Sequence, residues 1–188
     1  MSCLYLHIPF CRTKCQYCSF NSQARLDSLY PRYNQALIAE LLSIKSDKAV
    51  LETLFIGGGT PTVMNVLDLA ALAATCRDRF GFTRGAEISL EANPESIDYR
   101  FLSALREAGF NRLSIGIQSL NDGELKKLGR IHDAAMAREA VIDARRAGFD
   151  NLSIDLNAGL VQNGTRFDGN IFPNFFVVKN RVTTDANA

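Results

Sequence analysis

Short apolar runs alternate along the chain with longer segments of helical periodicity. The runs are dense in Val, Ile, Leu and Phe, which is typical of buried parallel strands. They cover residues 4–8, 53–57, 87–91, 112–117 and 151–156. Because a helical segment separates most of these runs, the pattern predicts an α/β fold with a parallel sheet and right-handed crossovers.

The intervening segments carry start and stop signals for helices. Pro31 predicts the first turn of one helix, which repeats four apolar residues on one face. These are Leu37, Ile38, Leu41 and Leu42. Asn65 is expected to cap a second helix that ends near Gly81, and a third is expected to open at Ser96 and end at Gly109. The inward face of the second helix is predicted to comprise Leu69, Leu72, Ala73 and Cys76.

An internal repeat refines this architecture. Residues 106–117 (REAGFNRLSIGI) and 145–156 (RRAGFDNLSIDL) share seven of twelve positions. Each copy combines a helix end, a glycine suited to the left-handed C′ position, and a strand. Such repetition favours a barrel-like (β/α) array over an open doubly wound sheet. About five units fit, so we expect an incomplete (β/α) barrel over residues 1–156, followed by a divergent, irregular tail over 157–188 with no further strand.

Composition and charge narrow the class of protein. The chain has 188 residues, of which 47% are hydrophobic, enough for one globular domain. Lys and Arg total 21 against 20 Asp and Glu, and the charges are dispersed, so a nucleic-acid partner is not expected. The apolar runs fall far short of the roughly 18 residues that span a bilayer, and no charged-then-apolar leader precedes residue 10. We therefore predict a cytoplasmic protein without a membrane span.

The strongest chemical signal is a C-x3-C-x2-C pattern directly after the first predicted strand, formed by Cys11, Cys15 and Cys18. No fourth Cys or His follows at zinc spacing, so three thiolates leave one metal position unfilled. Structural zinc sites are closed by four protein ligands, whereas a [4Fe–4S] cluster held by three thiolates keeps one iron free. A zinc site or a disulfide is the alternative reading. Cys3 and Cys76 are expected to be buried thiols.

Polar residues and glycines gather where the other predicted strands end, which is where parallel β/α folds place their chemistry. Glu91, Gln118 and Asp155 lie at or just after the ends of three strands. In the repeat, Asp155 stands where the sister copy has Gly116. A glycine run ends another strand, and the backbone amides near Gly58, Gly59 and Thr60 can approach and bind a charged group because glycine leaves room. Taken singly, each carboxylate could equally be a solvated loop-edge residue.

Six stretches occur in order along roughly residues 3–156. They are LYLHIPFCRTKCQYCSF, FIGGGTPT, SLEANPES, RLSIGIQSLND, LKKLGRIHD and NLSIDL. Together they resemble the radical S-adenosylmethionine (SAM) superfamily, in its oxygen-independent coproporphyrinogen III oxidase-like branch. The resemblance implies a radical SAM barrel, here incomplete, with a [4Fe–4S] cluster on Cys11, Cys15 and Cys18 whose open iron chelates SAM. Reductive cleavage of SAM would then give a 5′-deoxyadenosyl radical.

The resemblance also implies roles for residues around SAM. Those expected to border or bind it, besides the glycine turn, are Tyr5, Tyr17, Glu91, Gln118, Arg130 and Asp155. Arg130 could pair with a carboxylate, and Asp155 could accept hydrogen bonds from ribose hydroxyls. His7 belongs to the HIPFC stretch and is either a catalytic residue or a hydrogen-bonded core histidine. His132 is expected at the surface.

Phe20 separates two activities within this branch. The true oxidases carry a further cysteine two residues after the third cluster cysteine, and the form with phenylalanine there resembles the haem-chaperone subgroup. We therefore favour a protein that binds haem or porphyrin and passes it to an acceptor protein, with a reductant for the cluster. The alternatives are oxidative decarboxylation of coproporphyrinogen III, or an inactive truncated product. Whether the chain is an enzyme stays open at this stage.

Overall fold

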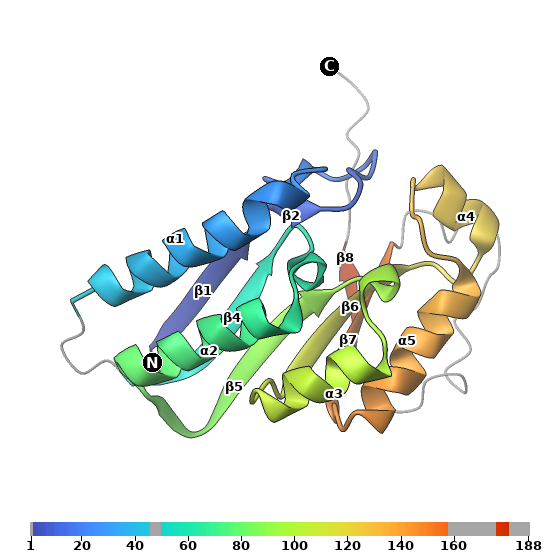
Figure 1. Cartoon of the computed structure of the whole chain (residues 1–188). Coiled ribbons are helices and arrows are strands. Elements are labelled where there is room, and N and C mark those ends of the chain that lie inside the picture. The colour runs from blue at the N-terminus through green and yellow to red at the C-terminus, as the bar shows by residue number, and fades with distance from the viewer. Residues whose placement is uncertain (1, 46–49, 158–175, 181–188) are drawn as a thin grey trace.

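Six parallel strands form the main sheet of the computed structural model, which describes residues 2–45, 50–157 and 176–180 (Figure 1). They are β1 (Cys3–Ile8), β4 (Leu51–Gly58), β5 (Phe82–Ala92), β6 (Arg112–Gln118), β7 (Asn151–Asn157) and β8 (Phe176–Asn180). The strand order in the sheet follows the sequence. Each crossover therefore moves one strand along, as in a barrel, and does not reverse as in a doubly wound sheet. The predicted α/β class with a partial (β/α) array is confirmed.

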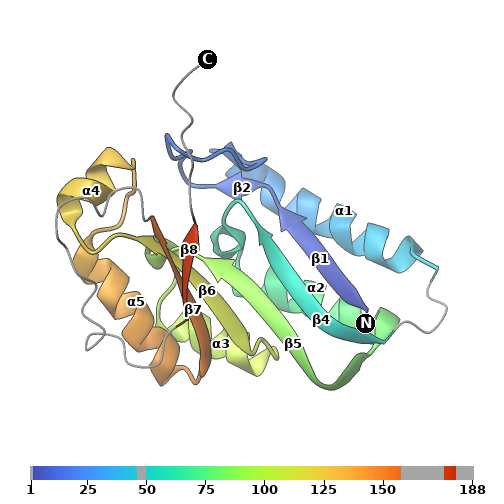
Figure 2. The same ribbon diagram turned by 180° about the vertical axis from the view of Figure 1, so that it is seen from behind.

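The helices cover one face of this sheet. They are α1 (Tyr30–Ser43), α2 (Val66–Phe80), α3 (Tyr99–Glu107), α4 (Asp122–Lys127) and α5 (Ala134–Arg146), with short 3-10 turns η1 (Asp27–Leu29), η2 (Pro61–Val63) and η3 (Pro94–Ser96). In Figure 2, the opposite face of the sheet is seen without a helix over it in the described part of the chain. This open face corresponds to the inside of a barrel.

Strand residues alternate between these two faces. Leu54 and Ile56 are fully buried on the helix side, within an apolar core that extends across the sheet. On the opposite face, Ser153 donates a hydrogen bond to Ser114 over 3.0 Å, and Ser114 donates to Asp155 over 3.4 Å. The sequence thus builds a dry helix-covered side and a polar inner side, and the inner side ends at the candidate site.

The two repeats adopt the same local structure. Gly109 and Gly148 have φ values of 99° and 87°, in the left-handed region that favours glycine. The phenylalanines that follow them, Phe110 and Phe149, are both fully buried. The predicted helix ends and strand starts are therefore confirmed in both copies.

The predicted helix caps are confirmed for α2 and are wrong for the start of α3. The Asn65 side chain accepts a hydrogen bond from the third backbone N–H of α2, and Gly81 ends that helix with a φ of 74°. The prediction that Ser96 opens the third helix is wrong, because Ser96 closes the separate turn η3 and Asp98 caps α3. Leu42 was expected to share one apolar face of α1 with Leu41, but Leu42 is 59% exposed whereas Leu41 is buried.

The region after Leu156 also departs from expectation. A recognisable strand was not predicted there, yet β8 pairs in parallel with β7, from Ser153↔Phe176 to Asn157↔Asn180. The rest of the predicted irregular tail, 158–175 and 181–188, lies outside the described residues. Among the helices that are described, none is both long and apolar enough to cross a membrane.

Candidate functional site

The cysteine motif lies on a loop that is closed at its base. β2 (Phe10–Cys11) pairs in parallel with β3 (Gln23–Ala24), so the chain leaves and returns at neighbouring positions. Within the loop, Lys14 Nζ donates to the carbonyl oxygen of Phe20 over 2.7 Å and to Ser22 Oγ over 2.9 Å. All five cysteines of the chain are free thiols. The Lys14 hydrogen bonds hold the two arms of the loop together, and the disulfide alternative is not what the structure shows.

One pocket joins this loop to the carboxyl ends of the strands. Predicted residues that line it are Cys11, Cys15, Tyr17, Cys18, Gly58, Gly59, Thr60, Glu91, Gln118, Arg130 and Asp155. Tyr5 and His7 do not line it. They lie nearby on β1, where Tyr5 Oη is 2.9 Å from His7 Nδ1 and His7 Nε2 is 2.9 Å from the Asn21 carbonyl oxygen. His7 thus has the hydrogen-bonded arrangement, and a catalytic role for it stays a prediction.

The glycine turn after β4 brings the main chain close to the cysteine loop. A Cβ on Gly59 would lie 2.5 Å from the Phe10 carbonyl oxygen and 2.9 Å from Cys11 Sγ. Gly58 has a φ of 121°, and its N–H donates to Glu91 Oε2 over 2.9 Å. Glycine is therefore needed at position 59 for the close approach of the two segments, and at position 58 for the backbone conformation.

Two carboxyl groups face this pocket from neighbouring parts of the sheet. Burial raises the pKa of Glu91, the charge of Asp155 raises it further, and the hydrogen bond from Gly58 opposes the shift. Burial also raises the pKa of Asp155, against a hydrogen bond from Ser114. Asp155 is in register with Gly116 across the β6–β7 pair, as the repeat predicted. Buried carboxyls with perturbed pKa values at a pocket are typical of ligand sites.

Gln118 adopts an uncommon backbone conformation at the end of β6, with a φ of 68°. It is followed by a tight turn in which the Ser119 N–H donates to the Ile117 carbonyl over 2.9 Å. Non-glycine residues in this region carry backbone strain that the surrounding structure must hold, and such strain concentrates at functional sites.

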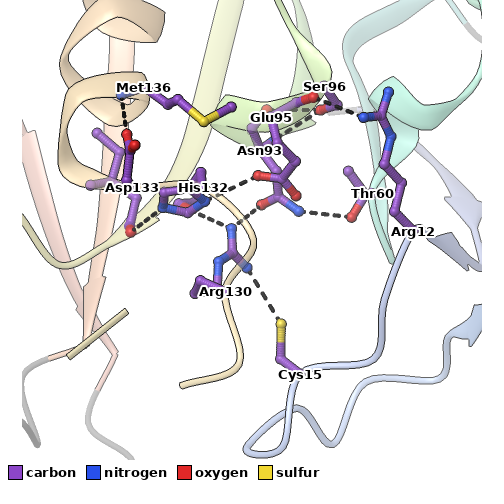
Figure 3. A network of polar contacts seen from close by, with 12 residues as sticks. Arg12, Cys15, Thr60, Asn93, Glu95, Ser96, Arg130, His132, Asp133 and Met136 are labelled. Atoms are coloured by element: carbon purple, nitrogen blue, oxygen red, sulfur yellow. Dashed lines mark hydrogen bonds and ion pairs between the residues drawn. The ribbon is translucent and has the colours of Figure 1, made fainter. Parts of the chain in front are cut away.

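Arg130 connects the rim of the sheet with the cysteine loop (Figure 3). Its Nη2 donates to Asn93 Oδ1 and to the Gly116 carbonyl oxygen, each over 2.7 Å, and its Nη1 lies 3.7 Å from Cys15 Sγ. Its buried Nε has no partner within the part of the chain that the structure describes. An unpaired buried guanidinium N–H is costly, so this atom is a donor that a bound ligand could satisfy.

A second chain of contacts reaches another cysteine. Asn93 Nδ2 donates to Thr60 Oγ1 over 2.9 Å, and Thr60 Oγ1 donates to Cys11 Sγ over 3.6 Å. Burial raises the pKa of Tyr17 to about 12, so its hydroxyl stays protonated beside Arg130. Two of the three sulfur atoms are thus hydrogen-bonded by groups that are anchored on the sheet.

The donor set fits an iron–sulfur cluster. Across residues 2–45, 50–157 and 176–180, no three His, Cys, Asp or Glu side chains converge on the position of a single metal ion. A [4Fe–4S] cluster does not need such convergence, because each thiolate binds a different iron. Three free thiols on one loop, a glycine turn packed against one of them and hydrogen bonds to two of their sulfurs suit such a group.

For several residues, the sequence predicted the wrong burial or no role. His132 was expected at the surface but is only 3% exposed, because the loop that carries it folds down between η3 and β6. Asn93 and Glu95 were part of the SLEANPES stretch but were given no role. Cys3 was expected to be buried and is exposed, because it starts the edge strand β1. Cys76 is buried as predicted, and burial raises its pKa to about 11.

Several curated proteins resemble this chain over most of its length. The "Heme chaperone HemW" of Mycobacterium tuberculosis is 40% identical over 161 residues, which is 83% of this chain and 41% of that protein. HemW of Escherichia coli is 38% identical, over 84% of this chain and 42% of that protein. A bovine protein named "Radical S-adenosyl methionine domain-containing protein 1, mitochondrial" is also 38% identical, over 84% of this chain and 36% of that protein. The chain thus matches about two fifths of the length of these relatives.

Solved structures agree with this likeness. E. coli coproporphyrinogen III oxidase (HemN), described as a radical SAM enzyme, superposes with a TM-score of 0.72 at 33% identity, over 82% of this chain and 37% of that one. HydG, a maturase of the [FeFe]-hydrogenase, matches with a TM-score of 0.53 at 15% identity, which shows a shared fold only. The family signature described as "Radical SAM superfamily" matches residues 5–165. On this match and on the identity to its relatives, the chain belongs to the radical SAM superfamily.

Proposed function

We propose that this chain carries the cluster- and SAM-binding region of a haem chaperone. The observation that carries the proposal is that one pocket unites the three thiols with the glycine turn and the carboxyls at the strand ends. Proteins of this superfamily generally use a [4Fe–4S] cluster and SAM. When bound, the cluster supplies the electron that cleaves the sulfonium of SAM.

The residues of this chain divide the binding task between them. Cys11, Cys15 and Cys18 are proposed to hold the cluster, since their loop lines one wall of the pocket. The amides around the glycine turn, with Glu91 and Gln118, are proposed to hold the polar groups of SAM. Asp155 faces them from β7, where its carboxyl can accept hydrogen bonds from hydroxyl groups.

Burial shapes what these groups can do. Because the raised pKa values of Glu91 and Asp155 come mainly from burial, a ligand that donates hydrogen bonds to the carboxylates would offset that desolvation cost. The unpaired Nε of Arg130 can in turn donate to an anionic group. A zwitterionic amino acid joined to a ribose offers donors and acceptors of both kinds.

Phe20 favours the chaperone over the oxidase. It lies at the edge of the pocket and is 62% exposed, at the position where the true oxidases are expected to carry a cysteine. Two relatives named haem chaperones, from Mycobacterium tuberculosis and Buchnera aphidicola, are 40% and 34% identical to this chain, and E. coli coproporphyrinogen III oxidase is 33% identical. Oxidative decarboxylation of coproporphyrinogen III is the second candidate. The observation that favours it is the superposition of this chain on the E. coli oxidase with a TM-score of 0.72.

Haem titration with a parallel turnover assay tests the proposal. The anaerobically reconstituted chain should bind haem with saturable absorbance changes, and it should not convert coproporphyrinogen III when SAM and reductant are present. Cys15→Ala is the control, because turnover that persists without the cluster cannot be radical SAM chemistry. Cluster-dependent conversion of coproporphyrinogen III, or the lack of any saturable haem binding, would refute the chaperone assignment.

A further inference from the structure

His132 is a buried polar residue that the proposed binding roles do not use. It lies in the short loop between α4 and α5, and its imidazole is fully buried. Its Nε2 is 3.0 Å from the Ile117 carbonyl oxygen. A carbonyl oxygen can only accept, so Nε2 is the donor in this hydrogen bond. The ring therefore holds the loop against the end of β6, one residue before the strained Gln118.

The other ring nitrogen faces a buried acid. His132 Nδ1 is 3.0 Å from Glu95 Oε2, and the Glu95 side chain is only 11% exposed. Burial on its own raises the pKa of Glu95, but the hydrogen bond from His132 and the charge of Arg130 lower it overall. Glu95 also reaches the cysteine loop, because its carbonyl oxygen accepts from Arg12 Nη1 over 3.1 Å.

His132 and Arg130 make equivalent bridges. Each side chain contacts one residue of the segment after β5 and one carbonyl near the end of β6, as Figure 3 shows for the β5 side. Arg130 joins Asn93 Oδ1 to the Gly116 carbonyl, and His132 joins Glu95 Oε2 to the Ile117 carbonyl. Only one residue separates His132 from Arg130 in the sequence. The contacts that hold His132 in place therefore also hold the backbone from which the Arg130 side chain extends.

The position of Arg130 determines its contact with Cys15. Arg130 Nη1 is 3.7 Å from Cys15 Sγ, a long contact that depends on where the loop holds the guanidinium. Hydrogen bonds to the sulfurs of a cluster tune its reduction potential, and groups one layer behind the ligands control such bonds. A loop that shifts by a fraction of an ångström would therefore alter the environment of the sulfur without removing any ligand.

We infer that His132 is a positioning residue, which acts through Arg130 to set the environment of Cys15 and of the SAM-binding rim. The inference rests on the proposed function, since that function assigns Cys15 to the cluster. His132 itself lies behind the pocket wall and touches neither the cysteine loop sulfurs nor the pocket.

The test compares His132→Ala with His132→Gln in the anaerobically reconstituted chain. The readouts are the midpoint potential of the cluster, from a redox titration followed spectroscopically, and the SAM dissociation constant. In His132→Ala the potential should become more negative, because a hydrogen bond to sulfur stabilises the reduced cluster. SAM should bind about tenfold more weakly, because displacing Arg130 weakens its hydrogen bond to a charged group of SAM. His132→Gln should keep values near the wild type, since its amide can donate to the Ile117 carbonyl from the position of Nε2.

Two further variants separate positioning from a general loss of structure. Phe149→Leu loosens the fully buried core at the end of α5 and should lower the melting temperature while leaving the potential unchanged. In an Arg130→Met background, His132→Ala should cause no further shift, because a residue that acts through Arg130 has nothing left to position. If His132→Ala does not fold, His132→Asn replaces it, as its shorter amide reaches toward Glu95 but not toward Ile117.

Three outcomes would overturn the inference. In the first, His132→Ala lowers the melting temperature and leaves both the potential and the SAM affinity at wild-type values. In the second, Phe149→Leu shifts the potential as far as His132→Ala does. In the third, the His132→Ala shift persists in full without Arg130. A wild-type chain that takes up no cluster would overturn the proposed function as well, so the two failures are distinguishable.

Discussion

Replacing Gly59 by alanine tests the close approach on which the site geometry depends. The added Cβ would lie 2.5 Å from the Phe10 carbonyl oxygen, about 0.9 Å inside the 3.4 Å at which ordinary van der Waals contact begins. The same oxygen accepts the Thr60 N–H over 2.7 Å, so the two segments cannot part without weakening that bond. Overpacking costs about 1–3 kcal/mol and a lost hydrogen bond about 1 kcal/mol, so we expect Gly59→Ala to lose about 2–4 kcal/mol.

The same substitution should also disturb metal loading, because the new Cβ would lie 2.9 Å from Cys11 Sγ. Urea denaturation gives the free energy of unfolding, and iron analysis after anaerobic reconstitution gives the loading. Gly123→Ala is the matched control, since its Cβ meets only the Asn121 side chain, at 3.1 Å, and alanine is favoured in a helix such as α4. Wild-type stability and iron content in Gly59→Ala would refute the argument from close approach.

Two further predictions concern the pocket. Glu91→Ala and Gln118→Ala should each weaken SAM binding about tenfold or more, the effect of losing a hydrogen bond to a charged group, while iron content stays unchanged. Equilibrium dialysis measures the affinity, and an unchanged value in both variants would count against the assigned roles. Burial raises the pKa of Asp155 in the folded chain, so its ionisation destabilises the fold as pH rises through that pKa. Asp155→Asn should therefore be more stable than the wild type at pH 7, with the gain vanishing below about pH 4, near the unfolded pKa. Denaturation at several pH values checks this, and a gain independent of pH would contradict the cause.

Local signals in the sequence predicted the parts of the fold that depend on local chemistry. Gly109 and Gly148 both adopt the left-handed φ that a C′ glycine supplies, and Asn65 caps its helix as its spacing from Asp68 suggests. The offset between the two repeats also predicted that Asp155 and Gly116 occupy equivalent positions, which the register of β6 and β7 confirms.

Features that depend on distant contacts could not be predicted in this way. His132 lies in a short polar loop, and only the docking of that loop against Glu95 and Ile117 buries it. Ser96 and Asp98 are both good cap residues two positions apart, and the separate turn at η3 decides between them. β8 forms because β7 offers an unpaired edge, which a stretch with weak strand signals can still join.

Anaerobic reconstitution of the chain with iron and sulfide tests the central claim most directly, namely that the loop of Cys11, Cys15 and Cys18 holds a [4Fe–4S] cluster. Metal analysis and absorbance spectroscopy should give about four irons per chain with a broad charge-transfer band, and Cys15→Ala should lose both. Stoichiometric zinc without iron–sulfur absorption in the wild-type chain, or a full cluster in Cys15→Ala, would contradict the account.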